Sequence, residues 1–109
     1  AQRLVRQIPV GEKVVDAILE IVRNGRPEST SFEDVKNHVM WGPGPRASQA
    51  LMLAVRARAL LTGRLSPSID DVATMAEPVL RHRMALSFSA RAEGITLSDV
   101  IEKLVDPVR

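Results

Sequence analysis

The stretch Trp41-Gly42-Pro43-Gly44-Pro45-Arg46-Ala47-Ser48-Gln49 places a stiff Gly/Pro turn directly before the longest apolar helical pattern of the chain. Pro45 suits the first position of a helix, where its missing N–H is no loss and its fixed φ is already helical. Arg46 then falls in the first turn, where the positive end of the helix dipole disfavours a cation by roughly 0.3–1 kcal/mol. An anion between Arg46 and the free N–H groups would turn this position into a binding site. The alternative is an Arg46 side chain that points into water.

The composition limits the class of protein. A chain of 109 residues makes one domain. With one Trp, two Phe and 45% apolar residues, its core must consist mainly of aliphatic side chains, which suits packed helices. Cysteine is absent, which excludes disulfides and thiolate metal sites and agrees with a cytoplasmic location. No apolar run approaches the ~20 residues that span a bilayer, so we expect no membrane partner.

Helical periodicity covers most of the chain. Pro78 should divide one helical segment into two, and residues 39–41 should be extended. Residues 86–92 are ambiguous and could include a short extended piece. The sequence therefore predicts an all-α bundle of four to five main helices, with room for one short strand pair. The helical segments expected are 12–24, 32–38, 45–62, 69–77, 79–84 and 97 to just before Pro107.

Several residues are typical of helix ends. Ser31, Ser68 and Thr96 each precede an aspartate by three residues, which is a capping pattern. Gly63 suits the position just after the long helix. On a helical wheel, that long helix is apolar nearly all round, which predicts a central place in the domain. Its main apolar face should be Ala47, Ala50, Leu51, Ala54, Ala57 and Leu61.

The charge is unevenly distributed, although its net value is only +2. No acidic residue lies between Asp34 and Asp70. This acid-free basic segment, residues 35–69, could be a solvated face, or it could bind nucleotide phosphates, a nucleic acid backbone or an acidic neighbouring domain. Arg58 lies within the apolar face and should pair with a carboxylate or extend to water. The cations of the acid-free segment are Lys36, Arg46, Arg56, Arg58 and Arg64.

The stretch 41–49 resembles the sensor-2 motif of the MoxR family of AAA+ ATPases, whose pattern is Gly-Ala/Gly-Ser/Gly-Pro-Arg-Ala. Gly63-Arg64 matches the family's Gly-Arg, and 78–83 matches its Val-Leu-Arg-His-Arg box. The segment from Ile8 to Pro27 resembles the start of the family's C-terminal lid. The resemblance therefore implies a hinge over residues 1–9 and a helical lid domain over 10–109.

The resemblance also implies a function. Arg46, supported by Pro45 and Gly44, would contact the terminal phosphate of ATP, which the full-length protein would hold with Mg²⁺. The lid would cover the nucleotide and couple hydrolysis to chaperone-like remodelling or maturation of client proteins. Its partners would be its own AAA+ core domain, the neighbouring subunits of a ring and a client protein. Gly44 stands where the family often has Ser, which could loosen the turn.

Part of the chemistry of an ATPase is missing from this chain. The sequence has no Gly-Lys pair, hence no P-loop, and no apolar strand that ends in Asp-Glu. We therefore expect no hydrolysis by the chain alone and no tightly bound cofactor, whereas the parent protein should be an ATPase. No metal site is expected, because His38 has no partner at a useful spacing. Arg81, His82 and Arg83 are either a solvated helix end or an interface with the core or a neighbouring subunit.

Two other classes fit the residues. The first is a helical nucleic-acid-binding module, which the acid-free basic segment suggests. Against it, a long helix that is apolar nearly all round leaves few exposed positions to enter a groove. The second is a protein-interaction bundle without a nucleotide role.

Overall fold

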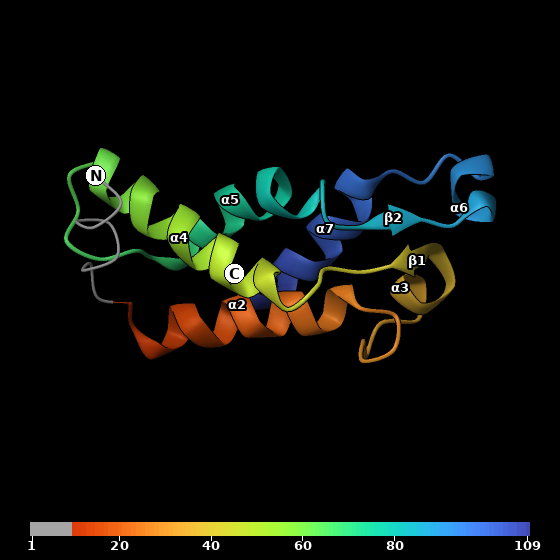
Figure 1. Cartoon of the computed structure of the whole chain (residues 1–109), viewed down its shortest axis with the longest axis horizontal. Helices are drawn as coiled ribbons and strands as arrows, with labels where there is room; N and C mark the ends of the chain where they lie inside the picture. Colours follow the sequence, from red (N-terminus) through yellow and green to blue (C-terminus); the bar gives the residue numbers. More distant parts are fainter. Residues whose placement is uncertain (1–9) are drawn as a thin grey trace.

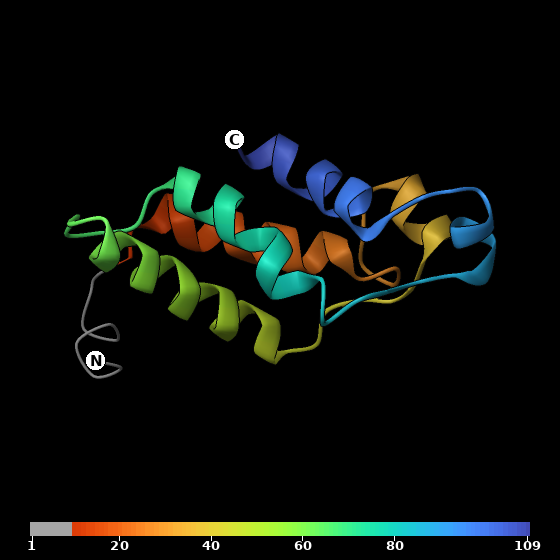
Figure 2. The same ribbon diagram turned by 90° about the horizontal axis from the view of Figure 1, so that it is seen from above.

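The fold is an elongated helical bundle, seen in a computed structural model that describes residues 10–109. The predicted hinge, residues 1–9, lies outside the described residues. Four main helices run along the long axis of the molecule (Figures 1 and 2). The all-α class is therefore confirmed. The main helices are α2 (Glu12–Gly25), α4 (Arg46–Leu61), α5 (Ile69–Leu80) and α7 (Leu97–Val105), and the 3₁₀ turn η1 (Asp106–Val108) follows.

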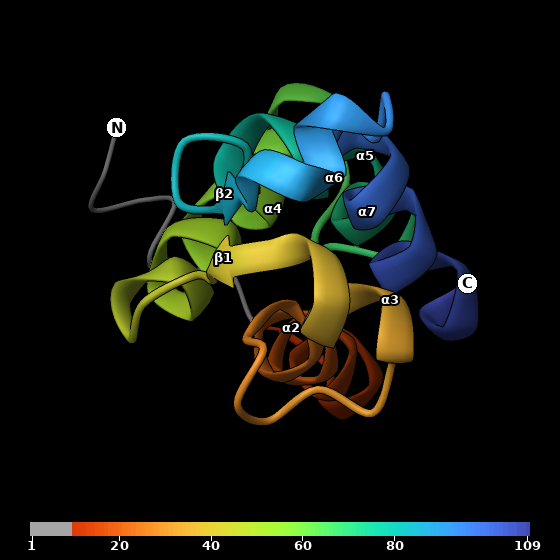
Figure 3. The same cartoon turned by 90° about the vertical axis from the view of Figure 1, so that its right-hand side faces the viewer.

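A small lobe closes one end of the bundle, nearest the viewer in Figure 3. Its two strands pair antiparallel, with Val39 opposite Leu86 and Trp41 opposite Ala85, so the short strand pair that the sequence left possible is present. The ambiguous stretch 86–92 is mostly helical: only Leu86 belongs to a strand, and α6 follows because the Ser87 hydroxyl accepts the N–H of Ala90 at 3.2 Å and caps a helix there. The lobe consists of α3 (Glu33–His38), β1 (Val39–Trp41), β2 (Ala85–Leu86) and α6 (Phe88–Ala92).

The predicted inner face of the long helix is partly wrong. Leu61 is 86% exposed, and the buried stripe follows i, i+4 spacing. The reason is that α4 packs mainly against α5 and α2 and is not the central helix. Instead, α5 contacts α4, α2 and α7, and α2 contacts α4, α5 and α7. The buried residues of α4 are Ala47, Leu51, Val55 and Ala59, whose two alanines allow close approach of neighbouring helices.

The predicted break at Pro78 is also wrong. α5 continues through Pro78 to Leu80, and no separate helix follows over residues 81–84. Pro78 lacks the N–H for one helical hydrogen bond and crowds the carbonyl four residues earlier, and α5 extends only two residues beyond it. The chain then turns because residues 85–86 pair with β1.

The predicted caps are confirmed at two of three places. Thr96 Oγ1 accepts the N–H of Asp99 at 3.1 Å, and Asp99 accepts the N–H of Thr96 at 3.2 Å. Ser68 forms the same reciprocal capping box with its aspartate. Ser31 does not cap α3; its N–H and hydroxyl both donate to Asn24 Oδ1, at 2.9 and 3.1 Å. The side-chain oxygen of the buried Asn24 therefore accepts the hydrogen bonds of Ser31, which the sequence pattern predicted as the N-cap of α3.

Gly63 follows α4 with a φ of 76°, as expected for a glycine at a helix C-terminus. Over the range 10–109, no helix has the length and apolar character needed to cross a membrane.

Candidate functional site

The Gly/Pro turn before α4 is fastened to the end of α2. Arg26 Nε donates to the carbonyl oxygen of Pro43 at 2.7 Å. Gly42 passes so close to α2 that an added Cβ would lie 2.3 Å from the carbonyl oxygen of Gly25 and 2.7 Å from the Cα of Arg26. Only glycine fits this approach. Sequence reasoning assigned no role to Arg26, and the structure shows that it holds the turn.

The turn delivers the chain into α4 with Arg46 as the first helical residue. Pro45 already has α-helical angles, with φ −59° and ψ −27°, but stands one residue outside the helix that was predicted to begin with it. The N–H of Ala47 donates to the carbonyl oxygen of Gly44 at 3.1 Å. The first turn of α4 contains no acidic residue. Arg46 is exposed and forms no ion pair within residues 10–109.

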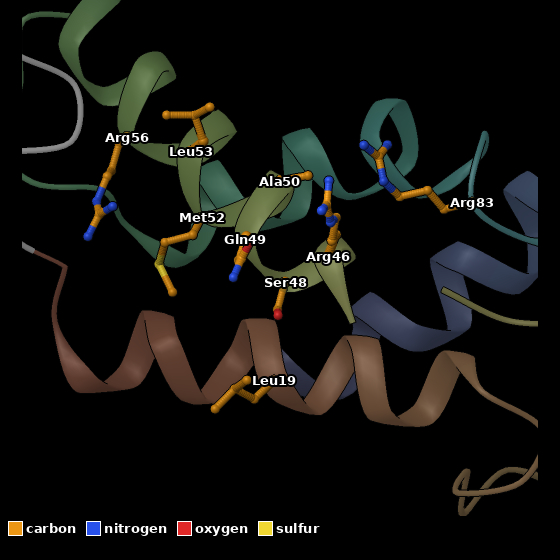
Figure 4. A pocket seen from close by; sticks show the side chains of 9 residues that line it. All are labelled: Leu19, Arg46, Ser48, Gln49, Ala50, Met52, Leu53, Arg56 and Arg83. Carbon is orange, nitrogen blue, oxygen red and sulfur yellow. The ribbon is translucent and has the colours of Figure 1, made fainter. Parts of the chain in front are cut away.

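A groove of about 640 Å³ runs along α4 and is also lined by Leu19 of α2 and by Arg83 (Figure 4). A second hollow of about 450 Å³ lies at the start of the helix and is lined by Gly44, Pro45, Arg46, Ala47 and Arg83. Arg46 and Arg83 line both, and neither is lined by Asp or Glu. The groove is lined by Leu19, Arg46, Ser48, Gln49, Ala50, Met52, Leu53, Arg56 and Arg83.

The structure separates the three residues of the Arg-His-Arg box. Arg81 and His82 are exposed and line neither hollow, whereas Arg83 is half-buried beside Arg46. Arg83 Nη1 donates to the carbonyl oxygen of Val79 at 2.8 Å, which fixes the side chain. The sequence patterns did not predict that Arg46 and Arg83 line the same hollow. The sequence indicates this proximity only indirectly. Arg83 comes just before β2, the Gly/Pro turn comes just after β1, and these two strands pair.

Two other arginines of the acid-free segment turn inward to one carboxylate. Arg58 and Arg64 both form ion pairs with Asp71, which is fully buried. Arg64 Nη1 donates to Asp71 Oδ2 at 2.8 Å, and the Ser68 N–H donates to the same oxygen at 2.7 Å. Of the two alternatives for Arg58, the structure shows the pairing with a carboxylate, and the Gly-Arg box has a structural role through Arg64.

Burial of Asp71 favours its protonated form and by itself raises the pKa of this carboxyl. The hydrogen bonds from Arg64, the Ser68 N–H and Arg58 together outweigh this effect and hold the pKa below its usual range. Asp71 therefore stays ionised and balances part of the charge of the two arginines.

The positive charge that remains is concentrated along the groove. Arg46 and Arg56 of α4 line it, together with Arg83. The Nε atom of Arg56 is buried and has no hydrogen-bond partner in the described part of the chain. Within residues 10–109, no three His, Asp or Glu side chains gather where they could hold a metal ion. The site is therefore suited to an anion.

Comparison with known proteins identifies the domain. The family model described as AAA lid domain matches residues 31–104. The chain is an AAA lid domain. The lid is 35% identical over 100 residues to the chaperone MoxR1 of Mycobacterium tuberculosis, an alignment that covers 91% of the lid and 26% of MoxR1. It is 32% identical over 108 residues to YeaC, an uncharacterised protein of Bacillus subtilis, covering 99% of the lid and 31% of YeaC.

A solved structure agrees with these relatives. The crystal structure of a presumed ATPase from Cytophaga hutchinsonii superposes on 98% of the lid with a TM-score of 0.89 and 26% identity, and the lid covers 33% of that chain. The predicted membership of the MoxR family of AAA+ proteins is thus confirmed. The lid spans about a quarter to a third of the length of these proteins.

Proposed function

We propose that this lid covers ATP bound to an AAA+ core domain and contacts its terminal phosphate through Arg46. The observation that carries the proposal is the exposed Arg46 guanidinium at the start of α4, without a carboxylate partner in the described residues. The turn before it is held in place by the Arg26 hydrogen bond and the close approach of Gly42. A guanidinium can grip a phosphate at two points, which a lysine cannot do.

The residues present fit one side of a nucleotide site. Arg46 and the free N–H groups of the first turn of α4 would bind and orient phosphate oxygens. Bound ATP and Mg²⁺ would supply the phosphoryl-transfer chemistry, with both held by a core domain. The apolar side chains of the groove, Leu19, Met52 and Leu53, would help to exclude water where the lid meets the core.

The wider role follows from the family and is also proposed. In the full-length protein, the lid, residues 10–109, would move relative to its own core as ATP is hydrolysed and would contact neighbouring subunits of a ring. Arg81 and His82 are exposed candidates for that contact. The relative named as chaperone MoxR1 supports chaperone-like remodelling or maturation of a client protein, which we place in the cytoplasm.

The nucleic-acid alternative has less support. Arg58 and Arg64 are the middle and the end of the basic segment, and both are engaged by Asp71. A backbone-binding surface would need these charges free to contact phosphates.

In the full-length ATPase, Arg46→Ala should lower the rate of ATP turnover by about 10- to 100-fold. The loss follows because a preorganised charge beside the developing negative charge of the transition state is removed. Arg46→Lys should recover part of the rate, since it keeps the charge and loses the planar fork. The measurement is steady-state phosphate release for Arg, Lys and Ala at position 46.

Thermal melting of the same variants serves as the control. Arg46→Ala should leave the melting temperature unchanged or slightly higher, because the replaced charge opposes the helix dipole. If Ala melts the domain while the folded fraction turns ATP over at the normal rate, Arg46 is structural and the sensor role is wrong.

The 109-residue chain by itself should bind ATP only very weakly. One face of a phosphate site cannot offset the entropy that a small ligand loses on association. Isothermal titration calorimetry should give no saturable heat at micromolar ATP. Micromolar affinity for this chain would contradict the division of roles between lid and core.

A further inference from the structure

We propose that Arg83 is a second phosphate-binding residue of the lid and acts together with Arg46 on the nucleotide. The proposal rests on the proposed function and extends it to a residue outside the Gly/Pro turn. It also divides the Arg-His-Arg box, since Arg83 would face the nucleotide while Arg81 and His82 remain exposed elsewhere.

The geometry brings the two arginines to one place from different elements. Arg46 begins α4, and Arg83 lies in the turn between α5 and β2. Both line the groove of about 640 Å³ and the hollow of about 450 Å³ at the helix start. Figure 4 shows the two guanidinium groups at the same end of the groove, with the Arg83 side chain extending toward Arg46.

The electrostatics of the pair favour a polyanion. Neither hollow has an Asp or Glu among its lining residues, so the two positive charges face each other without a counter-charge there. This differs from Arg58 and Arg64, whose charges are balanced by Asp71. Like charges that share a cavity repel each other. An oligophosphate bound between the two guanidinium groups would attract both of them and offset this repulsion. The chemical class that fits is a nucleotide di- or triphosphate.

Arg83 is held in a way that leaves donors for a ligand. A guanidinium has five N–H donors, and Nη1 of Arg83 uses one of them on the carbonyl oxygen of Val79. This bond anchors the side chain to the last turn of α5, while the structure gives Nε and Nη2 no acceptor within residues 10–109. An anchored arginine loses less side-chain entropy when it binds an anion.

The backbone ties Arg83 to Arg46. The strand pairing of β1 with β2 and the Ser87 N–H to His38 carbonyl bond, at 2.7 Å, join the segment after Arg83 to the segment before the Gly/Pro turn. The two arginines are therefore carried by segments that are hydrogen-bonded to each other, which would bring both to the nucleotide together.

The test measures nucleotide affinity of the full-length ATPase with the variants Arg83→Ala, Arg83→Lys, Arg46→Ala and the double Ala variant. Arg91→Ala is the charge control, because Arg91 is exposed on α6 and lines neither hollow. The probes are fluorescent analogues of ADP and of non-hydrolysable ATP, with inorganic tripolyphosphate as competitor. Arg83→Ala should weaken the ATP analogue and tripolyphosphate by about 10-fold, the loss typical of one charged hydrogen bond.

Arg83→Lys should lose less than Arg83→Ala, and Arg91→Ala should match the unmodified protein. A loss confined to the ATP analogue would assign Arg83 to the terminal phosphate, and an equal loss for the ADP analogue would assign it to the inner phosphates. Either supports the proposal. Unchanged affinities, with only a lower melting temperature from the lost bond to Val79, would overturn it.

The variants at position 46 separate the two proposals. If Arg46→Ala weakens the ATP analogue and Arg83→Ala does not, the function proposed for Arg46 stands and the role of Arg83 is wrong. If Arg46→Ala has no effect while Arg83→Ala weakens tripolyphosphate, the function proposed for Arg46 fails and Arg83 remains a phosphate ligand. In the double variant, losses smaller than the product of the single losses would support a shared anion, whereas fully multiplicative losses would contradict joint action.

Discussion

Gly42→Ala is expected to destabilise the lid by about 3 kcal/mol, at the upper end of the range for overpacking. The added Cβ would lie 2.3 Å from the carbonyl oxygen of Gly25 and 2.7 Å from the Cα of Arg26. Both atoms belong to the backbone at the end of α2, so no side chain can rotate away to make room. The free energy of unfolding, measured by urea titration with circular dichroism at 222 nm, should fall accordingly, and the melting temperature should fall by roughly 10–15 °C.

Gly44→Ala is the matched control two residues further on. A Cβ at Gly44 would meet no atom within 4 Å, and its φ is not in the positive range. This variant should therefore be neutral or more stable by about 0.4–1 kcal/mol, because alanine restricts the unfolded chain. Equal stabilities for the two variants would show that the turn can move away from α2 at little cost.

The same turn connects stability to the proposed site. Arg26 and Gly42 fix the turn against α2, and the turn fixes the first residue of α4. A turn displaced by Gly42→Ala would move Arg46, so the folded variant should also lose ATP turnover in the full-length protein. In this way the position of the Arg46 side chain depends on contacts at the C-terminal end of the neighbouring helix α2.

Local signals predicted the parts of the fold that depend on local chemistry. Gly63 and the Thr96–Asp99 pair mark helix ends because their effects act within one turn of backbone. Ser31 has the same pattern as Thr96 and fails, since the buried Asn24 of another helix takes its hydrogen bonds. Capping patterns therefore compete with tertiary partners that a single segment does not reveal.

Packing between helices determines which face of α4 is buried, a choice that the apolar periodicity of the sequence left open. The helix α4 is apolar on several sides, so its wheel allowed more than one inner face, and the neighbours α5 and α2 select the one that contains Val55 and Ala59. Pro78 predicted a break for a sound local reason, but α5 continues through it for two residues before it ends at Leu80.

The candidate site was predictable only in its first half. Arg46 could be proposed as a candidate because its turn and helix start are contiguous in sequence. Arg83 lies 37 positions later and reaches the site through the pairing of β1 with β2, short strands of three and two residues whose partners the sequence does not identify. The inward pairing of Arg64 with Asp71 was hidden for the same reason, because it depends on how the chain reverses between α4 and α5.

Asp71→Asn is expected to destabilise the lid by about 3 kcal/mol at pH 7. The change leaves Arg58 and Arg64 without their shared negative charge in a largely buried place, and losing one partner of a buried pair costs roughly 3–5 kcal/mol. The lower end of this range applies because the side chains of Arg58 and Arg64 are 29% and 37% exposed and can recover some hydration.

Urea titration of the 109-residue chain measures the difference in unfolding free energy, with Asp70→Asn as the control. Asp70 is 80% exposed and contacts Arg58 at 3.5 Å, so its loss should change stability by less than about 1 kcal/mol.

The dependence of the unfolding free energy on pH tests the contribution of the Asp71 carboxylate independently. The pKa of Asp71 is lowered in the folded lid, because its hydrogen bonds from Arg64, Ser68 and Arg58 outweigh the opposing effect of burial. An unfolded aspartate titrates near pH 3.9, so the stabilisation is fully present above about pH 5 and is lost as the pH falls below about 4 toward the folded pKa. Unfolding free energies measured from pH 6 to pH 2 should therefore fall steeply in the unmodified lid and less steeply in Asp71→Asn. Part of the slope will remain in the variant, because Lys103 lowers the pKa of Asp34 in the same direction. Parallel curves for the two proteins would mean that Asp71 contributes little as an ion, and that Arg58 and Arg64 are positioned by packing instead.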